Sequence, residues 1–304
     1  GTRVLSLAQL CVNFVVDHFD FVESLGDVGN DVRLAISKEL VSRNQLDNKA
    51  FMALVSAAGD DFSQATGVPP GLTPPPIPST LETLEIVDCA GISHDCMATM
   101  LQTVGGSLRY LLLSNAGRCF GSKSVKALLK EIKDATGEVH YTARAQLQCI
   151  SISGAYLLKD EDASHLITAN ASTLQSISLE TCPLLGPKFV CSIQSLHKHQ
   201  VPSNTAGNNR LLELALSNMT QFTASDLSVL SQESSESLQH LKSLTLENIG
   251  GLTDDVVGPI LAAAGLSLDN SLNLSHNHDL TDVTLSAIRQ FNPRVKTLIL
   301  DGLK

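Results

Sequence analysis

One apolar pattern returns along most of this chain at a spacing of 27 residues. From Leu81 onward, apolar residues fill an L-x-x-L-x-L core and two further positions, three and six residues after it. A pattern that returns at such a period predicts one structural unit repeated side by side. Unit starts are assigned to Leu81, Leu108, Leu147, Leu174, Leu211, Leu241, Leu268 and Val295, giving steps of 27, 39, 27, 37, 30, 27 and 27 residues.

Each unit has two parts with different apolar periods. The L-x-L core alternates, which is typical of a short strand, and a stretch with helical spacing follows it. Neither element can bury its apolar face alone, so stacked units are expected to form an α/β solenoid with parallel strands on the concave face and helices on the convex face. The helical stretches are exemplified by Val256, Val257, Ile260, Leu261 and Ala264, and by Val125, Leu128, Leu129 and Ile132.

Caps and irregularities refine this expectation. Ser93, Thr253 and Thr281 stand where helices should begin, and their side-chain oxygens can accept hydrogen bonds from exposed amides. The two longest steps predict insertions around 133–144 and 197–209 that loop out from the stack. In the unit that begins at Leu268, the next two leucines fall one place late, so we expect a local bulge there.

The chain divides into three segments. Residues 1–66 have a helical pattern, residues 67–80 are rich in proline and form a linker or stiff cap, and residues 81–304 carry the repeats, about eight with the last truncated. The chain starts with Gly1 and stops within a repeat, so we expect it to be a fragment of a longer protein.

Composition excludes several classes of protein. With 304 residues, 43% hydrophobic and 17% charged, the chain can bury a large core, and it contains no apolar run long enough for a membrane span. A net charge of -10 argues against direct nucleic-acid binding, which relies on Lys and Arg to neutralise phosphates. The seven cysteines are odd in number and several occupy apolar repeat positions, so reduced thiols in a cytosolic or nuclear protein are expected.

Catalytic, cofactor and metal sites are not predicted. No nucleophile with a base, carboxylate pair or phosphate-binding loop stands out, so the chain is expected not to be an enzyme and to need no cofactor. Three groups of residues have spacings that a metal could use. All are poor candidates, because Cys89 occupies an inward apolar position of its repeat and the two histidine pairs are expected in loops. They are His197 with His199, His276 with His278, and Cys89 with His94 and Cys96.

The strand residues between the leucines should face outward on the concave side. Small polar and acidic residues dominate there, which suits a protein partner, such as a basic segment, better than DNA; the alternative is a solvated sheet surface with no ligand. The candidate binding residues on this face are Glu85, Tyr110, Leu112, Glu180, Glu213 and Glu247.

A second candidate surface lies near the N-terminus. A predicted amphipathic helix opens at Ser6, and its apolar residues recur at helical spacing. Such a helix either docks in the groove of a partner or caps the first repeat. The candidate partner-binding residues are Leu7, Leu10, Cys11, Phe14 and Val15.

Three resemblances connect these features. The repeats resemble the cysteine-containing leucine-rich repeats of F-box adaptors, and the spacing of Ser6, Leu7, Cys11 and Val15 resembles the box by which adaptors dock to elongin C. The order of elements, including 21–46, resembles the Rad-seven type of DNA repair protein. That resemblance implies a nuclear, non-catalytic subunit that recognises a protein substrate, acts with a Snf2-type ATPase in nucleotide excision repair, and bridges elongin C and a cullin-type ubiquitin ligase.

One departure and two alternatives accompany this interpretation. No Leu-Pro-apolar-Pro cullin box follows the docking helix, because prolines 69–78 do not have that order. The first alternative is an F-box-like adaptor or mitotic-exit regulator built on the same repeats. The second is a leucine-rich regulator of a small GTPase, suggested by the acidic concave rim.

Overall fold

The computed structural model describes residues 6–26, 28–56, 81–133, 139–196, 210–231 and 236–303. The proline-rich segment 67–80, the end of the expected helical segment at 57–66 and the insertion at 197–209 with His197 and His199 lie outside the described residues.

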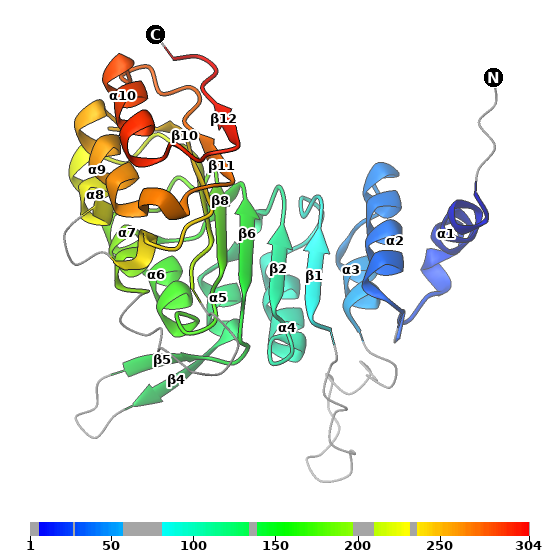
Figure 1. The fold of residues 1–304 in the computed structure, drawn as a ribbon. Coiled ribbons are helices and arrows are strands. Elements are labelled where there is room, and N and C mark those ends of the chain that lie inside the picture. Colours follow the sequence, from blue (N-terminus) through cyan, green and yellow to red (C-terminus); the bar gives the residue numbers. More distant parts are fainter. Residues whose placement is uncertain are drawn as a thin grey trace, which may run out of the picture.

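Eight parallel strands form the main sheet, and their order in the sheet follows their order in the chain (Figure 1). Neighbouring strands of this sheet are therefore joined by the segment of chain that lies between them, as the repeat predicts. The strands are β1 (Thr83–Ile86), β2 (Tyr110–Leu113), β6 (Cys149–Ser153), β8 (Ser176–Glu180), β9 (Glu213–Met219), β10 (Ser243–Ile249), β11 (Ser271–Asn273) and β12 (Thr297–Ile299).

Helices follow the strands and pack together along one side of the sheet (Figure 1). A unit with one strand and one helix, predicted from the two apolar periods, is confirmed along most of the stack. The helices are α4 (His94–Val104), α5 (Ser122–Leu128), α6 (Asp160–Ala169), α7 (Pro187–Gln194), α8 (Ala224–Ser228), α9 (Asp254–Ala264) and α10 (Asp282–Phe291).

The leucine positions of neighbouring strands are in register and form the core. Leu84 pairs with Leu111, and Leu214 pairs with Leu244, so equivalent residues of successive units lie side by side. From β1 to β11 the strand side chains at the last two positions of the L-x-x-L-x-L core are at most 2% exposed. In β12 the equivalent Leu298 is 45% exposed, because this strand lies at the edge of the sheet.

The first insertion forms a hairpin rather than an irregular loop. We expected Leu129 and Ile132 to continue a helix; instead α5 ends at Leu128, and Leu129–Lys133 form β4, antiparallel to β5 (Val139–Ala143). Tyr141 of β5 stacks against His165 of α6, with ring centroids 4.5 Å apart, which holds the hairpin to the next unit. The helical interpretation was wrong here because the strand pairing across the hairpin overrides the local spacing.

The irregular unit at Leu268 absorbs its extra residue before the strand. Leu272 pairs with Leu244, and the main sheet keeps its register through β11. In other units two successive amides share one carbonyl, as Arg109 and Tyr110 share that of Glu82. Between β11 and β12, the amides of Lys296 and Thr297 instead donate to two different carbonyls, those of Asp269 and Asn270. The irregularity is therefore confined to the residues just before β11.

The expected caps are mostly confirmed. The hydroxyl of Ser93 accepts a hydrogen bond from the Cys96 amide, and that of Thr281 accepts one from the Val283 amide. Thr253 occupies the N-cap position of α9, but its side chain makes no capping bond there.

Aspartates at helix starts connect neighbouring units. Asp160 accepts hydrogen bonds from the amides of Gly186, Lys188 and Phe189 at the start of α7. Asp254 accepts bonds from the amide and hydroxyl of Thr281 and from the Thr284 hydroxyl, 2.5 Å away, at the start of α10. Partial burial acts to raise the pKa of Asp254, but these bonds outweigh it and hold the pKa below its usual value.

Replacing Asp254 by asparagine is expected to lower the free energy of unfolding by about 1 kcal/mol at pH 7, because it weakens hydrogen bonds to the next unit. Since the folded-state pKa is depressed, this contribution is present above pH of about 4 and is lost as the pH falls through the folded-state value. Denaturant titrations at pH 7 and pH 3 would measure it. Asp255→Asn, an exposed neighbour, is the matched control, and equal losses in both variants would contradict the assignment.

The N-terminal helices cover the first edge of the sheet. They are α1 (Leu7–Asp17), the short 3-10 helix η1 (Phe19–Phe21), α2 (Asn30–Ser42) and α3 (Asn48–Val55). Helix α2 contacts β1, α3 contacts α4, and α1 packs on α2, farthest from the sheet (Figure 1). No helix in the described ranges is long and apolar enough to cross a membrane.

The cysteines differ sharply in exposure. Cys89, Cys119 and Cys182 are buried, and burial raises the pKa of the Cys182 thiol to about 11. Cys11 and Cys191 are exposed. All seven thiols are free.

We expect N-ethylmaleimide to modify Cys11 and Cys191 fastest in the folded protein, because the buried thiols are shielded from the reagent. Peptide mass spectrometry over a time course would measure each rate. Labelling of Cys182 at the rate of Cys191 without denaturant would contradict the packing of the repeats.

Candidate partner-binding surfaces

Helix α1 has an inner and an outer apolar face. Its N-terminus is capped by the Ser6 hydroxyl, which accepts a hydrogen bond from the Gln9 amide. Val12 and Val16 are buried on the inner face, 9% and 2% exposed. The outer side carries four exposed residues, which we call the exposed α1 face: Leu7 (77% exposed), Leu10 (51%), Phe14 (64%) and Cys11.

An apolar groove of about 350 Å³ lies beside this face, between α1 and α2. Cys11, Val12 and Val15 form its α1 wall, and Val32 and Ala35 are among the α2 residues that line it. Val15 is only half-buried and packs against the core. The five predicted docking residues therefore share one end of the molecule. Cys11 and Val15 line the groove, and Leu7, Leu10 and Phe14 are the more exposed side chains outside it.

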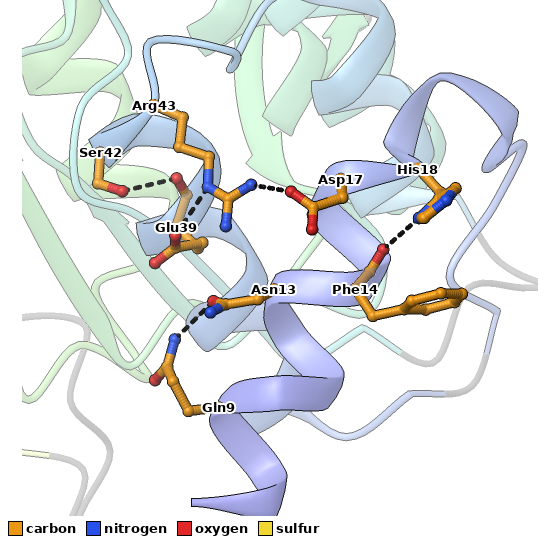
Figure 2. A network of polar contacts seen from close by, with 8 residues as sticks. All are labelled: Gln9, Asn13, Phe14, Asp17, His18, Glu39, Ser42 and Arg43. Atoms are coloured by element: carbon orange, nitrogen blue, oxygen red, sulfur yellow. Dashed lines mark hydrogen bonds and ion pairs between the residues drawn. The ribbon is translucent and has the colours of Figure 1, made fainter. Parts of the chain in front are cut away.

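Polar contacts fix α1 on α2 (Figure 2). The guanidinium of Arg43 bonds to Asp17 at the end of α1 and, 2.8 Å away, to Glu39 of α2. Its hydrogen bonds to Asp17 and then Glu39 raise the pKa of Arg43 above its usual value. This bridge joins the end of α1 to the end of α2, on which α1 packs.

The aromatic side chains near the end of α1 enlarge the exposed apolar area. Phe14 lies against His18, with ring centroids 4.5 Å apart, and the backbone carbonyl of Phe14 contacts His18 Nδ1 at 2.9 Å (Figure 2). Phe21 is 85% exposed, whereas Phe19, two residues earlier, is buried. The helical spacing did not identify Phe21 because it lies in η1, where the period of α1 has ended.

The second candidate surface is the outward side of the main sheet. Its register places the predicted residues in rows that run across the strands: Tyr110 next to Cys149 in one row, Leu112 next to Glu85 in the second, and Glu180 and Glu247 on either side of Ser217 in the third. The expected alternation of inward and outward residues is confirmed by the burial of the strands, in which the leucine positions are buried and the positions between them are not.

The glutamates of this face are held by neutral side chains of adjacent units. The Ser176 hydroxyl donates to Glu213 at 3.0 Å, Asn218 donates to Glu180 at 3.3 Å, and Asn273 donates to Glu247 at 3.2 Å. Among the described residues no Lys or Arg forms an ion pair with these three carboxylates. The surface is therefore acidic and polar.

The candidate metal ligands do not form a site in the described part of the chain. There, no three side chains of His, Cys, Asp or Glu gather as a metal would require. Cys89 is buried in the core, and the Cys96 thiol lies 3.7 Å from the Asn48 carbonyl in α3.

Parallel strands in chain order, helices along one side and an in-register leucine core define a mixed α/β fold built from stacked leucine-rich units. No protein-family model matches the sequence, and no curated protein matches it. The fold is similar to the crystal structure of the Rad7 and Elc1 complex in yeast, with a TM-score of 0.60 and 16% sequence identity. The similarity covers 97% of this chain and 67% of that chain. The protein therefore has a Rad7-like fold.

Proposed function

We propose that this protein is a non-catalytic adaptor that docks to elongin C through the exposed α1 face and uses its leucine-rich repeats to hold a further protein. The observation that carries the proposal is the face itself, with Leu7 77% and Phe14 64% exposed at the end of the molecule. A contiguous apolar surface of this kind marks a protein interaction site. It supports the docking interpretation over a capping helix alone.

The inner face of α1 contributes to folding, and the outer face is available for binding. Val12 and Val16 bury their side chains within the protein, so α1 caps α2 as the alternative expects. The outer residues remain available for a partner, in the helix-in-groove mode in which an amphipathic helix presents successive apolar anchors. The similarity to a structure solved as a complex with Elc1 supports the choice of elongin C.

The wider assignment to repair rests on the Rad7-like fold and on the resemblance in sequence. On this proposal, the chain links elongin C and a cullin-type ubiquitin ligase to a repair complex with a Snf2-type ATPase in the nucleus. The acidic outward face of the sheet would hold a protein substrate or the ATPase, rather than DNA. Free cysteines throughout the chain fit a reducing compartment.

Titrating the protein with purified elongin C by calorimetry tests the proposal. We expect a one-to-one complex with a Kd of about 1 µM or lower, as for a helix anchored by several apolar side chains. A parallel titration with the Skp-type linker distinguishes the F-box-like alternative. Binding to the Skp-type linker, with none to elongin C, would overturn the proposal in favour of that alternative.

A further inference from the structure

The apolar groove between α1 and α2, which we call the α1–α2 groove, is open to solvent. Val32 is 48% exposed, and Ala8 and Cys11 are also exposed. Among the described residues, only those of α1 and α2 line the groove, and Asp31 is the one charged side chain in this lining. Because the other lining side chains are apolar, a polar group placed there would lose its hydrogen bonds to water without replacement. The groove therefore favours an apolar side chain as its occupant.

One row of α1 residues leads from the exposed α1 face into the groove. Leu7, Cys11 and Val15 follow one another at intervals of four residues, so they form a row that turns gradually around the helix. Leu7 lies outside the groove, Cys11 belongs both to the exposed face and to the groove wall, and Val15 is half-buried in that wall. The exposed α1 face and the α1–α2 groove are therefore one continuous apolar surface.

A partner that covers the exposed α1 face also covers the groove, because Cys11 belongs to both. The core of a protein interface packs about as densely as a protein interior, and an apolar space left unfilled there forfeits its van der Waals contacts. At about 350 Å³, the groove has room for an aliphatic or aromatic side chain. A partner that docks tightly on α1 should therefore also supply an apolar side chain to the α2 wall of the groove.

We propose that the α1–α2 groove receives an apolar side chain of elongin C, so that Val32 and Ala35 of α2 belong to the docking surface together with α1. This inference rests on the proposed docking to elongin C and extends it, because the docking residues predicted from the sequence all lie on α1. Leu7, Leu10 and Phe14 project from this chain toward the partner, whereas at the groove the partner projects into this chain. Protrusions beside a recess fix one relative orientation of the two proteins through their complementary shapes.

NMR of the whole chain, with isotope-labelled valine methyl groups and saturating unlabelled elongin C, tests this inference directly. We expect intermolecular NOEs from the methyl groups of Val15 and Val32 to side-chain protons of elongin C. Val283, 61% exposed on α10, is the internal control and should show none. If the complex forms and neither groove valine contacts elongin C, the groove inference is overturned while the proposed docking stands. If no complex forms, the proposed docking and the groove inference are both overturned.

Ala35→Leu measures what the groove contributes to affinity. The larger side chain occupies the groove from its α2 wall, so the affinity for elongin C should fall about tenfold, while the midpoint of thermal unfolding should not fall. Ala287→Leu is the matched control, because Ala287 is also a partly buried helical alanine, on α10, and its affinity should be unchanged.

Val32→Glu, at a position that is exposed in the free protein, is a second groove variant that should also lower the affinity about tenfold or more, because a carboxylate enters an apolar site. Full affinity in both groove variants, together with lost binding in Leu7→Asp, would overturn the groove inference and leave docking through α1 intact. The NMR experiment needs no variant, so it decides the inference even if Ala35→Leu does not fold.

Discussion

Leu7→Asp is expected to lower the affinity for elongin C about 100-fold or more. The leucine side chain contributes about 1.5 to 3 kcal/mol when a partner buries it, and a carboxylate at the same place must lose its water without an opposite charge. Because Leu7 is 77% exposed in the free protein, the unfolding transition should not move. Calorimetric titration and thermal unfolding measure the two effects separately.

Leu266→Asp is the matched control for this substitution. Leu266 is 56% exposed in the 3-10 helix after α9, so the chemical change is the same but the location is at the other end of the stack (Figure 1). Its affinity for elongin C should equal that of the unchanged protein. Undiminished binding by Leu7→Asp, or an equal loss in both variants, would contradict the assignment of the exposed α1 face as the docking surface.

Leu244→Ala is expected to lower the free energy of unfolding by about 2 to 5 kcal/mol. Leu244 is fully buried in β10, in register with Leu214 and Leu272 of the neighbouring strands. Truncation leaves a cavity in a core that units on both sides share, so the loss includes both the lost burial and the unfilled space. Denaturant unfolding followed by circular dichroism measures this change.

Thr245→Ala, one residue later, tests the alternation of the strand. Thr245 points to the outward side of the same strand, so its truncation should change the free energy of unfolding by less than about 0.5 kcal/mol. Similar losses for the two variants would mean that the inward and outward sides are not distinguished by packing, which would contradict the leucine core.

The register of the main sheet could be predicted from the sequence because one physical constraint determines it. Equivalent leucines must point inward in every unit, and shifting a strand by one residue would expose them. This is why the pairing of Leu84 with Leu111 follows from the repeat alone. The extra residue after Leu268 follows from the same constraint, since the strand keeps its inward leucines and the approach to it changes.

The hairpin and the packing of α2 and α3 against β1 could not be predicted in the same way. Leu129 and Ile132 fit a helical period, and only their pairing with Ala143 and His140 reveals a strand. The packing of α2 on β1 and of α3 on α4 involves contacts between segments that lie on either side of the proline-rich stretch. The apolar period within one segment does not show how that segment packs against others that are distant in the sequence.

The sequence predicted which residues of α1 share a face, but not which of them pack against α2. Helical spacing correctly brought Leu7, Cys11 and Phe14 to one face of α1. It could not tell which part of that apolar surface packs on α2, so Val15 was grouped with residues that are more exposed. The packing of α1 on α2 decides which of these residues are covered, and the Arg43 bridge between Asp17 and Glu39 joins the same two helices.

The most direct test of the docking surface is the reaction rate of Cys11 with N-ethylmaleimide, measured with and without saturating elongin C. Cys11 belongs to the exposed α1 face, and Cys191, exposed on α7, is an internal control in the same chain. The proposal predicts that elongin C slows modification of Cys11 about tenfold or more and leaves Cys191 unchanged. A complex in which Cys11 reacts at its original rate would contradict the proposal.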